Sequence, residues 1–287
     1  MRPIQRTLLC VTGALVALPA TTRAELELPR ESPPARIWQQ VGLTDIALEY
    51  VSPAVKGRKI WGAVVPYGQP WAFGGHQAPK LRFSRDVTIG DKVVPAGAYS
   101  LFAIPDKGEW TLALERNADQ AGAGREHRPE LEAARVRVRP TVGQSREHLR
   151  FTFASFTDDE AVLEFGWDKL QIALPIGVNT SRQVAVDLVG LDSTWRSYAN
   201  AARYMLEAKK DYVAGLFYVD QSLALKQDWY NVWIKALLLA GKGEYKAAAK
   251  EAQLAYDLGS KSSDATFPEA EIKRTLADWG QKNVAAR

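Results

Sequence analysis

The sequence predicts an α+β protein of two domains, an N-terminal antiparallel β-sandwich followed by a C-terminal α-helical repeat domain. From about residue 36 to residue 180, apolar and polar residues alternate over short runs separated by glycine and proline, which is typical of half-buried strands. After residue 181, Ala, Leu, Lys and Tyr recur with a helical period. The chain has 287 residues, of which 46% are hydrophobic and nine are Trp, so it has enough apolar material for two cores.

The N-terminus has the layout of a secretory signal peptide. Arg2 and Arg6 precede an apolar run over residues 8–20, and small residues follow. We expect cleavage after Ala24, with Ala20 as the alternative, and a periplasmic or secreted mature protein. The single cysteine lies at position 10, so the mature chain is expected to have no disulfide.

Charge argues against a nucleic-acid partner, and hydropathy argues against a membrane span. The signal holds three arginines and no acid, so its removal lowers the formal net charge from +4 to +1. The remaining sequence has no long Lys/Arg block, and we therefore expect no nucleic-acid partner. No later segment reaches the roughly 18 consecutive apolar residues of a membrane span. The predicted divisions are a signal peptide at 1–24, a linker at 25–35, the sandwich at 36–180 and the helices at 181–287.

Eight or more short strands are expected in the first domain. Turn residues separate them at 90–91, 95–97 and 106–108, where glycine permits a positive φ and proline presets a bend. The strands with one apolar face are predicted around residues 46–50, 81–83, 110–114, 149–153, 163–167 and 170–176.

The second domain shows an internal repeat. Lys210-Asp211-Tyr212 and Gly243-Glu244-Tyr245 are each expected to open a helix, and they lie 33 residues apart, a spacing typical of tetratricopeptide-like helix pairs. Further helices are predicted over 195–209 and over 229–240, the latter capped by Asp228. Thr266 with Glu269 predicts a capping box for a terminal helix.

The segment from Lys56 to Pro79 is the least ordinary part of the chain, because aromatic and basic residues stand among several glycines and prolines. It can line a cleft whose aromatic walls and polar groups hold a ligand. It can equally be a crossover whose tryptophans plug the open end of the sandwich. Under the first interpretation the ligand-binding candidates are Arg58, Lys59, Trp61, Tyr67, Trp71, His76 and Gln77.

Other chemistry has little support in the sequence. The three histidines have no metal-ligand spacing, so neither a metal site nor a cofactor is predicted. Arg135, Arg137 and Arg139 alternate with valines and share one strand face, with Arg150 expected on a neighbouring strand. They can bind an anion, but a solvated face paired with acids such as Glu130 and Glu132 is the favoured interpretation.

Several short pieces resemble a known family. KGRKIWG, VPYG, VPAGAYSLFAIP and EWTL occur between residues 56 and 114 in the order found in the exported bacterial domain of unknown function 2911. Residues 195–258 look like the helical tail that many members carry. The resemblance implies the fold but no activity. Members usually show Gly-x-Asn-Glu-Ala-Thr where this chain has residues 74–79, so Gln77 replaces an acid and His76 is the remaining candidate base.

Three functional hypotheses follow. The leading one is a non-enzymatic exported protein that holds a small cell-envelope ligand in the 58–77 segment and binds a protein partner through its helices. The alternative is a hydrolase of envelope material, with His76 as general base and Arg58 or Lys59 stabilising an anion. The third is a purely structural role without a ligand.

Overall fold

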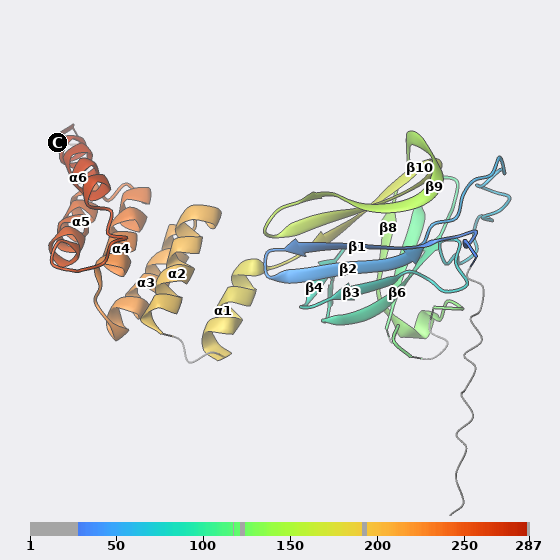
Figure 1. The fold of residues 1–287 in the computed structure, drawn as a ribbon, viewed down its shortest axis with the longest axis horizontal. Coiled ribbons are helices and arrows are strands. Elements are labelled where there is room, and N and C mark those ends of the chain that lie inside the picture. Colours follow the sequence, from blue (N-terminus) through green and yellow to red (C-terminus); the bar gives the residue numbers. More distant parts are fainter. Residues whose placement is uncertain (1–27, 117, 121–123, 191–193, 286–287) are drawn as a thin grey trace, which may run out of the picture.

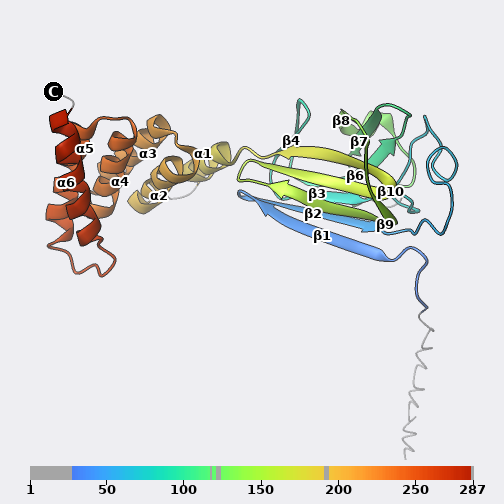
Figure 2. The same cartoon turned by 90° about the horizontal axis from the view of Figure 1, so that it is seen from above.

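The computed structural model describes residues 28–116, 118–120, 124–190 and 194–285, which form a β-rich part followed by six α-helices (Figure 1). The β-rich part consists of two antiparallel sheets, and the helices extend from one end of it (Figure 2). The α+β architecture predicted from the change of sequence period is therefore confirmed. The predicted signal peptide lies outside the described residues.

The larger sheet has six strands in the order β1-β2-β3-β6-β7-β8, and every neighbouring pair is antiparallel. Its alternation is clear in β2, where Ile46 and Leu48 are fully buried and Glu49 is exposed. The strands are β1 (Pro34–Val41), β2 (Thr44–Val51), β3 (Lys80–Phe83), β6 (Gly97–Ile104), β7 (Trp110–Glu115) and β8 (Glu132–Val138).

The smaller sheet has four strands in the order β5-β4-β10-β9. The last strand is irregular: its pairing with β9 shifts register around Gly166 and Asp168, and Asp168 has a φ of +51°. Both ends of this strand lie close together, because the Val178 N–H donates to the Asp159 carbonyl. The strands are β4 (Val87–Ile89), β5 (Lys92–Val94), β9 (Thr141–Phe156) and β10 (Glu160–Gly177).

The core of the sandwich lies between the two sheets and is rich in aromatic side chains. The faces predicted from alternation supply it, since both β7 and β10 bury their apolar positions. A fully buried large apolar side chain contributes roughly 1.5–3 kcal/mol. The largest fully buried side chains of this core are Trp110, Trp167, Phe73, Phe83, Phe151 and Phe165.

Helix α1 (Thr180–Gly190) joins the sandwich to the remaining helices. Thr180 is buried, and its hydroxyl donates to the Asp158 carbonyl in the β9–β10 turn. Gly42, in the β1–β2 turn, has a φ of +54° and leaves no room for a Cβ beside Thr180. Arg85 binds Asp187 with two hydrogen bonds of 2.9 and 3.0 Å. The first helix is thus held by two hairpin turns and a bidentate ion pair.

The other helices pack in pairs, α2 with α3 and α4 with α5. Tyr212 and Tyr245 are the first residues of α3 and α5, as the 33-residue offset predicts. Ala248, Ala252 and Ala255 are fully buried, so α5 lies close against its neighbours. The helices are α2 (Trp195–Tyr204, continued as a π-helical turn over Met205–Lys209), α3 (Tyr212–Leu225), α4 (Trp229–Gly241), α5 (Tyr245–Gly259) and α6 (Glu269–Ala285).

The predicted capping box at Thr266 is wrong. The last helix begins at Glu269, and the Thr266 hydroxyl donates to Asp264 at 2.7 Å. Thr266 therefore belongs to a turn that precedes the helix, since Asx-type turns compete with capping for the same short side chains. Within the described ranges, no helix is both long and apolar enough to cross a membrane.

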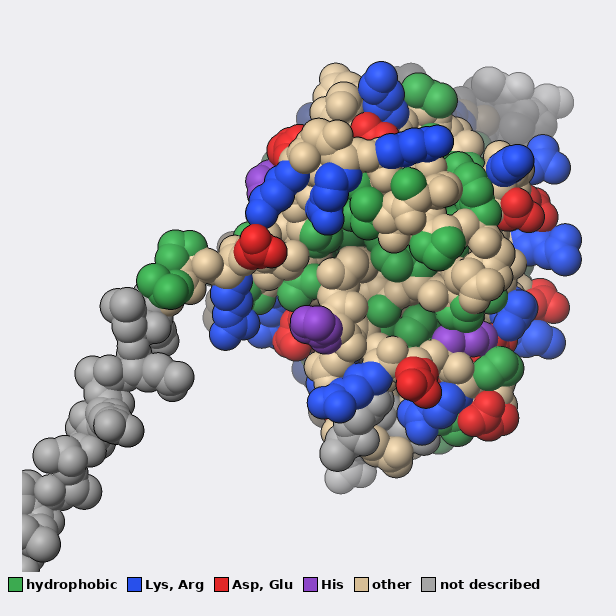
Figure 3. Space-filling view, turned by 90° about the vertical axis from the view of Figure 1, so that its right-hand side faces the viewer, with side chains coloured by type: hydrophobic (Ala, Val, Ile, Leu, Met, Phe, Trp, Pro, Cys, Tyr) green, Lys and Arg blue, Asp and Glu red, His purple; other side chains and the backbone are tan. Residues whose placement is uncertain are grey.

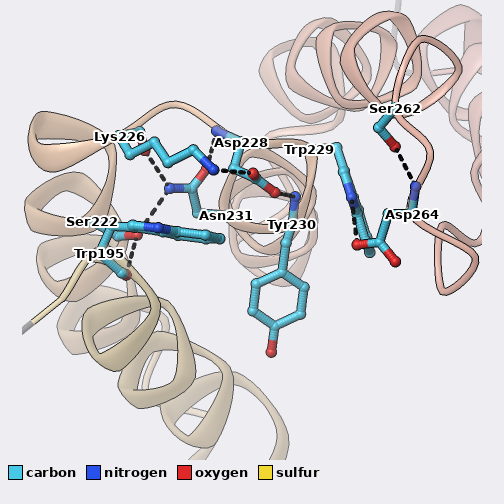
Figure 4. A network of polar contacts seen from close by, with 9 residues as sticks. All are labelled: Trp195, Ser222, Lys226, Asp228, Trp229, Tyr230, Asn231, Ser262 and Asp264. Atoms are coloured by element: carbon cyan, nitrogen blue, oxygen red, sulfur yellow. Dashed lines mark hydrogen bonds and ion pairs between the residues drawn. The ribbon is translucent and has the colours of Figure 1, made fainter.

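A buried polar network connects α2, α3 and α4 (Figure 4). The Asn231 amide nitrogen donates to the Ser222 hydroxyl at 2.9 Å and to the Lys226 carbonyl at 2.7 Å. Its amide oxygen accepts from the Asp228 N–H, which completes the capping box of α4. The Ser222 hydroxyl in turn donates to the Trp195 carbonyl at 2.6 Å. Asn231 and Ser222 are fully buried, so their bonds have no competition from water.

Candidate functional site

The aromatic residues of the 56–79 segment pack on the sandwich core. The segment connects β2 to β3 at the end of the sandwich far from the helices (Figure 1). The Trp61 ring lies 5.0 Å from Trp110 and 6.1 Å from Trp167, centroid to centroid. Phe73 is only 1% exposed and has a φ of +50°, a conformation that aims its ring into the core.

Trp71 is held in the same way. It forms an isolated bridge with Ala103, with hydrogen bonds of 2.7 and 3.0 Å in both directions. Its ring stacks on Trp167 at 5.9 Å with an interplanar angle of 7°. The structure therefore brings Trp61 and Trp71 together, with the geometry of a crossover that fills the end of the core.

The polar candidates of the segment are not brought together. The Arg58 guanidinium donates to the Ala54 carbonyl at 2.6 Å and to the Val55 carbonyl at 3.0 Å, so it stabilises its own turn. Over the residues that the structure describes, no hydrogen bond or ion pair joins Arg58, Lys59, His76 and Gln77 to one another. All four are exposed, and Tyr67 is half-buried. Figure 3 shows this end of the sandwich, with apolar side chains at the centre and Lys and Arg around them.

The three alternating arginines form an exposed, paired face. Arg135 binds both carboxylate oxygens of Glu132, at 2.9 and 2.6 Å, as the favoured interpretation requires. Arg137 and Arg139 instead share Glu109, at 3.5 and 3.7 Å. The expectation that Arg150 lies on a neighbouring strand is wrong. It belongs to β9 in the other sheet, because the chain crosses between sheets after β8.

A buried cluster of titratable groups lies on the outer face of the larger sheet. Glu115 is 1% exposed, and the His127 Nε2 lies 3.7 Å from it and 2.8 Å from Glu132. The His127 ring also packs edge-on against Phe102 at 5.5 Å. One oxygen of Glu115 accepts from the Arg128 N–H, and the other has no partner among the described residues.

The two acids of this cluster have shifted pKa values. Burial raises the pKa of Glu115, against the opposing effects of the Arg128 N–H and the His127 charge. The pKa of Glu132 is lowered instead, first of all by its hydrogen bonds with Arg135. The pKa values of Glu115 and Glu132 are therefore shifted in opposite directions, although both carboxylates face the His127 imidazole.

The helices enclose a groove of about 410 Å³ between α2, α4 and the start of α6. Beneath it lie Trp229, Trp233 and Ile234, which are all largely buried, so the surface of the hollow is mixed polar and apolar. The complete lining is Arg196, Arg203, Leu206, Glu207, Trp229, Tyr230, Trp233, Ile234, Leu237, Thr266, Pro268 and Glu271. We call this hollow the helical groove.

A cation is held at the rim of the helical groove by aromatic rings. The Arg196 guanidinium lies 4.9 Å from the Trp195 ring and 5.4 Å from the Tyr230 ring. No described carboxylate lies within ion-pair distance of it, although its charge contributes to lowering the pKa of Asp264. Arg203, in contrast, is paired with Glu207 at 2.8 Å. Arg196 is thus oriented by its neighbours while its N–H groups stay free of an ion pair.

Comparison with protein families identifies the β-rich part. A family described as a protein of unknown function (DUF2911) matches residues 32–176, which is half of the chain. The chain belongs to this family. The match ends at the last strand of the sandwich, before α1, so the DUF2911 domain and the β-sandwich coincide. Comparisons with curated proteins and with solved structures give no match.

The DUF2911 domain contains the residues that sequence reasoning missed. Alternation along β7 places Glu115 on the outer face of the sheet and predicts that it is exposed. Residues 118–120 and 124–131 cover that face, and Asp119 binds Lys80 at 3.0 Å and Arg82 at 2.9 Å. The alternation within a strand does not show that a later part of the chain covers its outer face, so the burial of Glu115 could not be predicted from it. In the helices, Trp229 and Trp233 are largely buried, and they line the helical groove together with the half-buried Tyr230. The described residues contain no group of three His, Cys, Asp or Glu placed to hold a metal ion.

The buried Glu115 makes a prediction about pH. Because its folded-state pKa is raised above the ordinary value of 4.5, it favours folding when protonated, and this contribution is lost as pH rises through the raised pKa. The Glu115→Gln variant stays neutral at every pH. We therefore expect its free energy of unfolding to rise relative to that of the wild type as the pH is raised from about 4 to about 8. Urea unfolding at several pH values measures the difference. Glu130→Gln, at an exposed position nearby, is the control. A difference that is independent of pH contradicts the prediction.

Proposed function

We propose that this chain is a non-enzymatic binding protein whose helical groove holds an extended, acidic segment of a partner protein. The observation that carries the proposal is the Arg196 guanidinium, which lies over the Trp195 and Tyr230 rings at the rim of the helical groove. A preoriented guanidinium can bind a carboxylate with two parallel hydrogen bonds. Because the Trp195 and Tyr230 rings already order the Arg196 side chain, less side-chain entropy is lost on binding.

The shape and lining of the helical groove support a peptide as the occupant. The lining mixes polar and apolar side chains: Tyr230 and Leu237 are half-buried, and Arg196 and Glu271 are exposed. Aromatic residues and arginine are the side chains most often found at the centre of protein interfaces. The 33-residue offset between the two helix pairs supports a tetratricopeptide-like character of this region.

The proposal includes an exported location, periplasmic or secreted. It is supported by Arg2, Arg6 and the apolar run over residues 8–20, followed by small residues up to Ala24. A partner is then expected among envelope or extracellular proteins.

Selection from a displayed library of 12-residue peptides tests the proposed function. We expect enrichment of Asp or Glu next to an aromatic or aliphatic residue, because this pair matches Arg196 and the half-buried Tyr230 ring beside it. For a selected peptide, Arg196→Gln should weaken binding about tenfold or more, the value of a charge-assisted hydrogen bond. Fluorescence anisotropy gives the affinities.

The matched control is Arg274→Gln, an exposed arginine of α6 that does not line the helical groove. It should leave the affinity unchanged. Equal affinities of the wild type and Arg196→Gln would refute the role of Arg196, and a library without enrichment would refute the peptide-binding function.

A further inference from the structure

A short turn on the outer face of the larger sheet is attached through one largely buried side chain. It comprises residues 127–131, and its last three, Pro129–Leu131, form a 3₁₀-helical turn without a buried residue. The His127 side chain, in contrast, is only 6% exposed. At the end of the turn, the Arg116 N–H donates to the Leu131 carbonyl at 3.0 Å. We call residues 127–131 the His127 turn; because it buries little apolar surface, polar contacts must hold it in place.

The polar contacts of the His127 turn involve groups that titrate. The His127 Nε2 lies 2.8 Å from Glu132, at the start of β8, and 3.7 Å from Glu115 on β7. The Arg128 N–H donates to the Glu115 carboxylate. An imidazole and two carboxylates therefore determine how firmly the turn is attached, and histidine is the side chain whose charge ordinarily changes near neutral pH.

The two carboxylates that face His127 are compensated unequally. On β8, both carboxylate oxygens of Glu132 accept hydrogen bonds from Arg135. The Arg116 guanidinium, next to Glu115 in the chain, donates to the Glu132 carbonyl at 3.2 Å rather than to a carboxylate. Glu132 therefore keeps a cationic partner when His127 is neutral, whereas Glu115 does not.

The remaining elements around the imidazole supply no further ion pair for Glu115. Strand β6 contributes the uncharged Phe102 ring, and its one ionisable residue, Tyr99, lies in the core on the opposite face. Arg128 gives Glu115 its N–H and a more distant positive charge. In the described part of the chain, His127 is the only cationic side chain within ion-pair distance of Glu115, whose second oxygen has no hydrogen-bond partner there.

We propose that the His127 turn docks on the sheet in a pH-dependent manner: it is held while Glu115 and His127 share one proton, and it moves away when that proton is lost. With the proton on the imidazole, its positive charge lies between Glu115 and Glu132 and offsets both. With the proton on Glu115, the buried side chain is neutral. Without the proton, a buried carboxylate faces a neutral ring and a second carboxylate, and contact with water stabilises it.

The docked state is favoured at the lower pH. Burial raises the pKa of Glu115 in this state, so the docked state binds the proton more tightly than an open state in which Glu115 meets water. This contribution to docking is lost as the pH rises through the raised pKa. Opening removes the His127 ring from Phe102, which is 2% exposed when the turn is docked. An apolar surface is then expected to appear at the higher pH.

Hydrogen exchange of the mature protein at about pH 5.5 and about pH 8.5 tests the proposal. The informative amides are those of Arg128 and Leu131, whose N–H groups are bonded in the docked turn. After correction for intrinsic exchange rates, we expect their protection to fall about tenfold or more, because one linked proton changes an equilibrium by up to about tenfold per pH unit. At the higher pH it should lie at least about tenfold below that of the β2 amides, since the opening is local.

Two variants and a control assign the effect. Glu115→Gln has no charge to expose and should keep the turn protected at about pH 8.5, whereas His127→Gln removes the anchor and should lower protection at about pH 5.5. The control is His148→Gln, at an exposed histidine of β9, which should behave like the wild type.

Four results would overturn the pH-dependent docking. They are equal protection of the His127 turn at both pH values, protection equal to that of β2 at both, a full wild-type decrease in Glu115→Gln, and wild-type protection in His127→Gln. Loss of the pH dependence in His148→Gln would also contradict it, because the decrease would then come from another histidine.

Discussion

Replacing Trp71 with alanine should lower the free energy of unfolding of the sandwich by about 3 kcal/mol, the usual cost of removing a large aromatic side chain from a core. The loss arises because Trp71 contacts Phe73, Trp61 and Trp167 at once. No other substitution in the 56–79 segment separates the two sequence-based interpretations as clearly.

Hydrogen exchange of the β6 and β7 amides measures this effect on the sandwich alone, which matters because two structural parts need not unfold together. Lys59→Ala, at an exposed position of the same segment, is the control and should change stability by less than about 0.5 kcal/mol. If the segment instead lines a ligand cleft, Trp71→Ala should abolish ligand binding while protection of these amides stays at the wild-type level.

Replacing Asn231 with leucine should destabilise the helices by about 3 kcal/mol, because Asn231 is fully buried and the change removes its hydrogen bonds to the Lys226 carbonyl and the Asp228 N–H. The two groups belong to the ends of different helices, so the same change loosens α3 against α4. Thermal unfolding followed by circular dichroism at 222 nm reports on it.

A surface asparagine provides the comparison for Asn231. Asn200 is exposed and accepts one hydrogen bond from Tyr230, so Asn200→Leu should cost less than about 1 kcal/mol. Similar losses of stability for the two substitutions would show that burial of Asn231 does not increase its contribution to stability.

The parts of the fold that depend on local pattern could be predicted from the sequence. Alternation located β2, β3, β7, β9 and β10, although it divided β10 into two strands at its irregular middle, and the 33-residue offset located the starts of α3 and α5. The cap at Asp228 was equally visible, since it needs only residues three apart.

The parts that depend on contacts between distant residues could not be predicted. Trp61 and Trp71 are equally suited to line a cleft or to fill a core, and the choice depends on Trp110 and Trp167, far along the chain. Glu115 is buried by a segment that lies outside its strand, and Asn231 bonds to Ser222 on another helix. The free Arg196 guanidinium likewise depends on Tyr230, 34 positions away.

The attachment of α1 determines how the molecule responds to mechanical force. Thr180 contacts the turns of the β1–β2 and β9–β10 hairpins. About two helical turns further along α1, Asp187 forms an ion pair with Arg85. Tension applied through the helices is therefore divided between the two sheets at once, and it acts along the strands rather than across them. Hydrogen bonds that run perpendicular to the strands are sheared together under such a load instead of opening one by one.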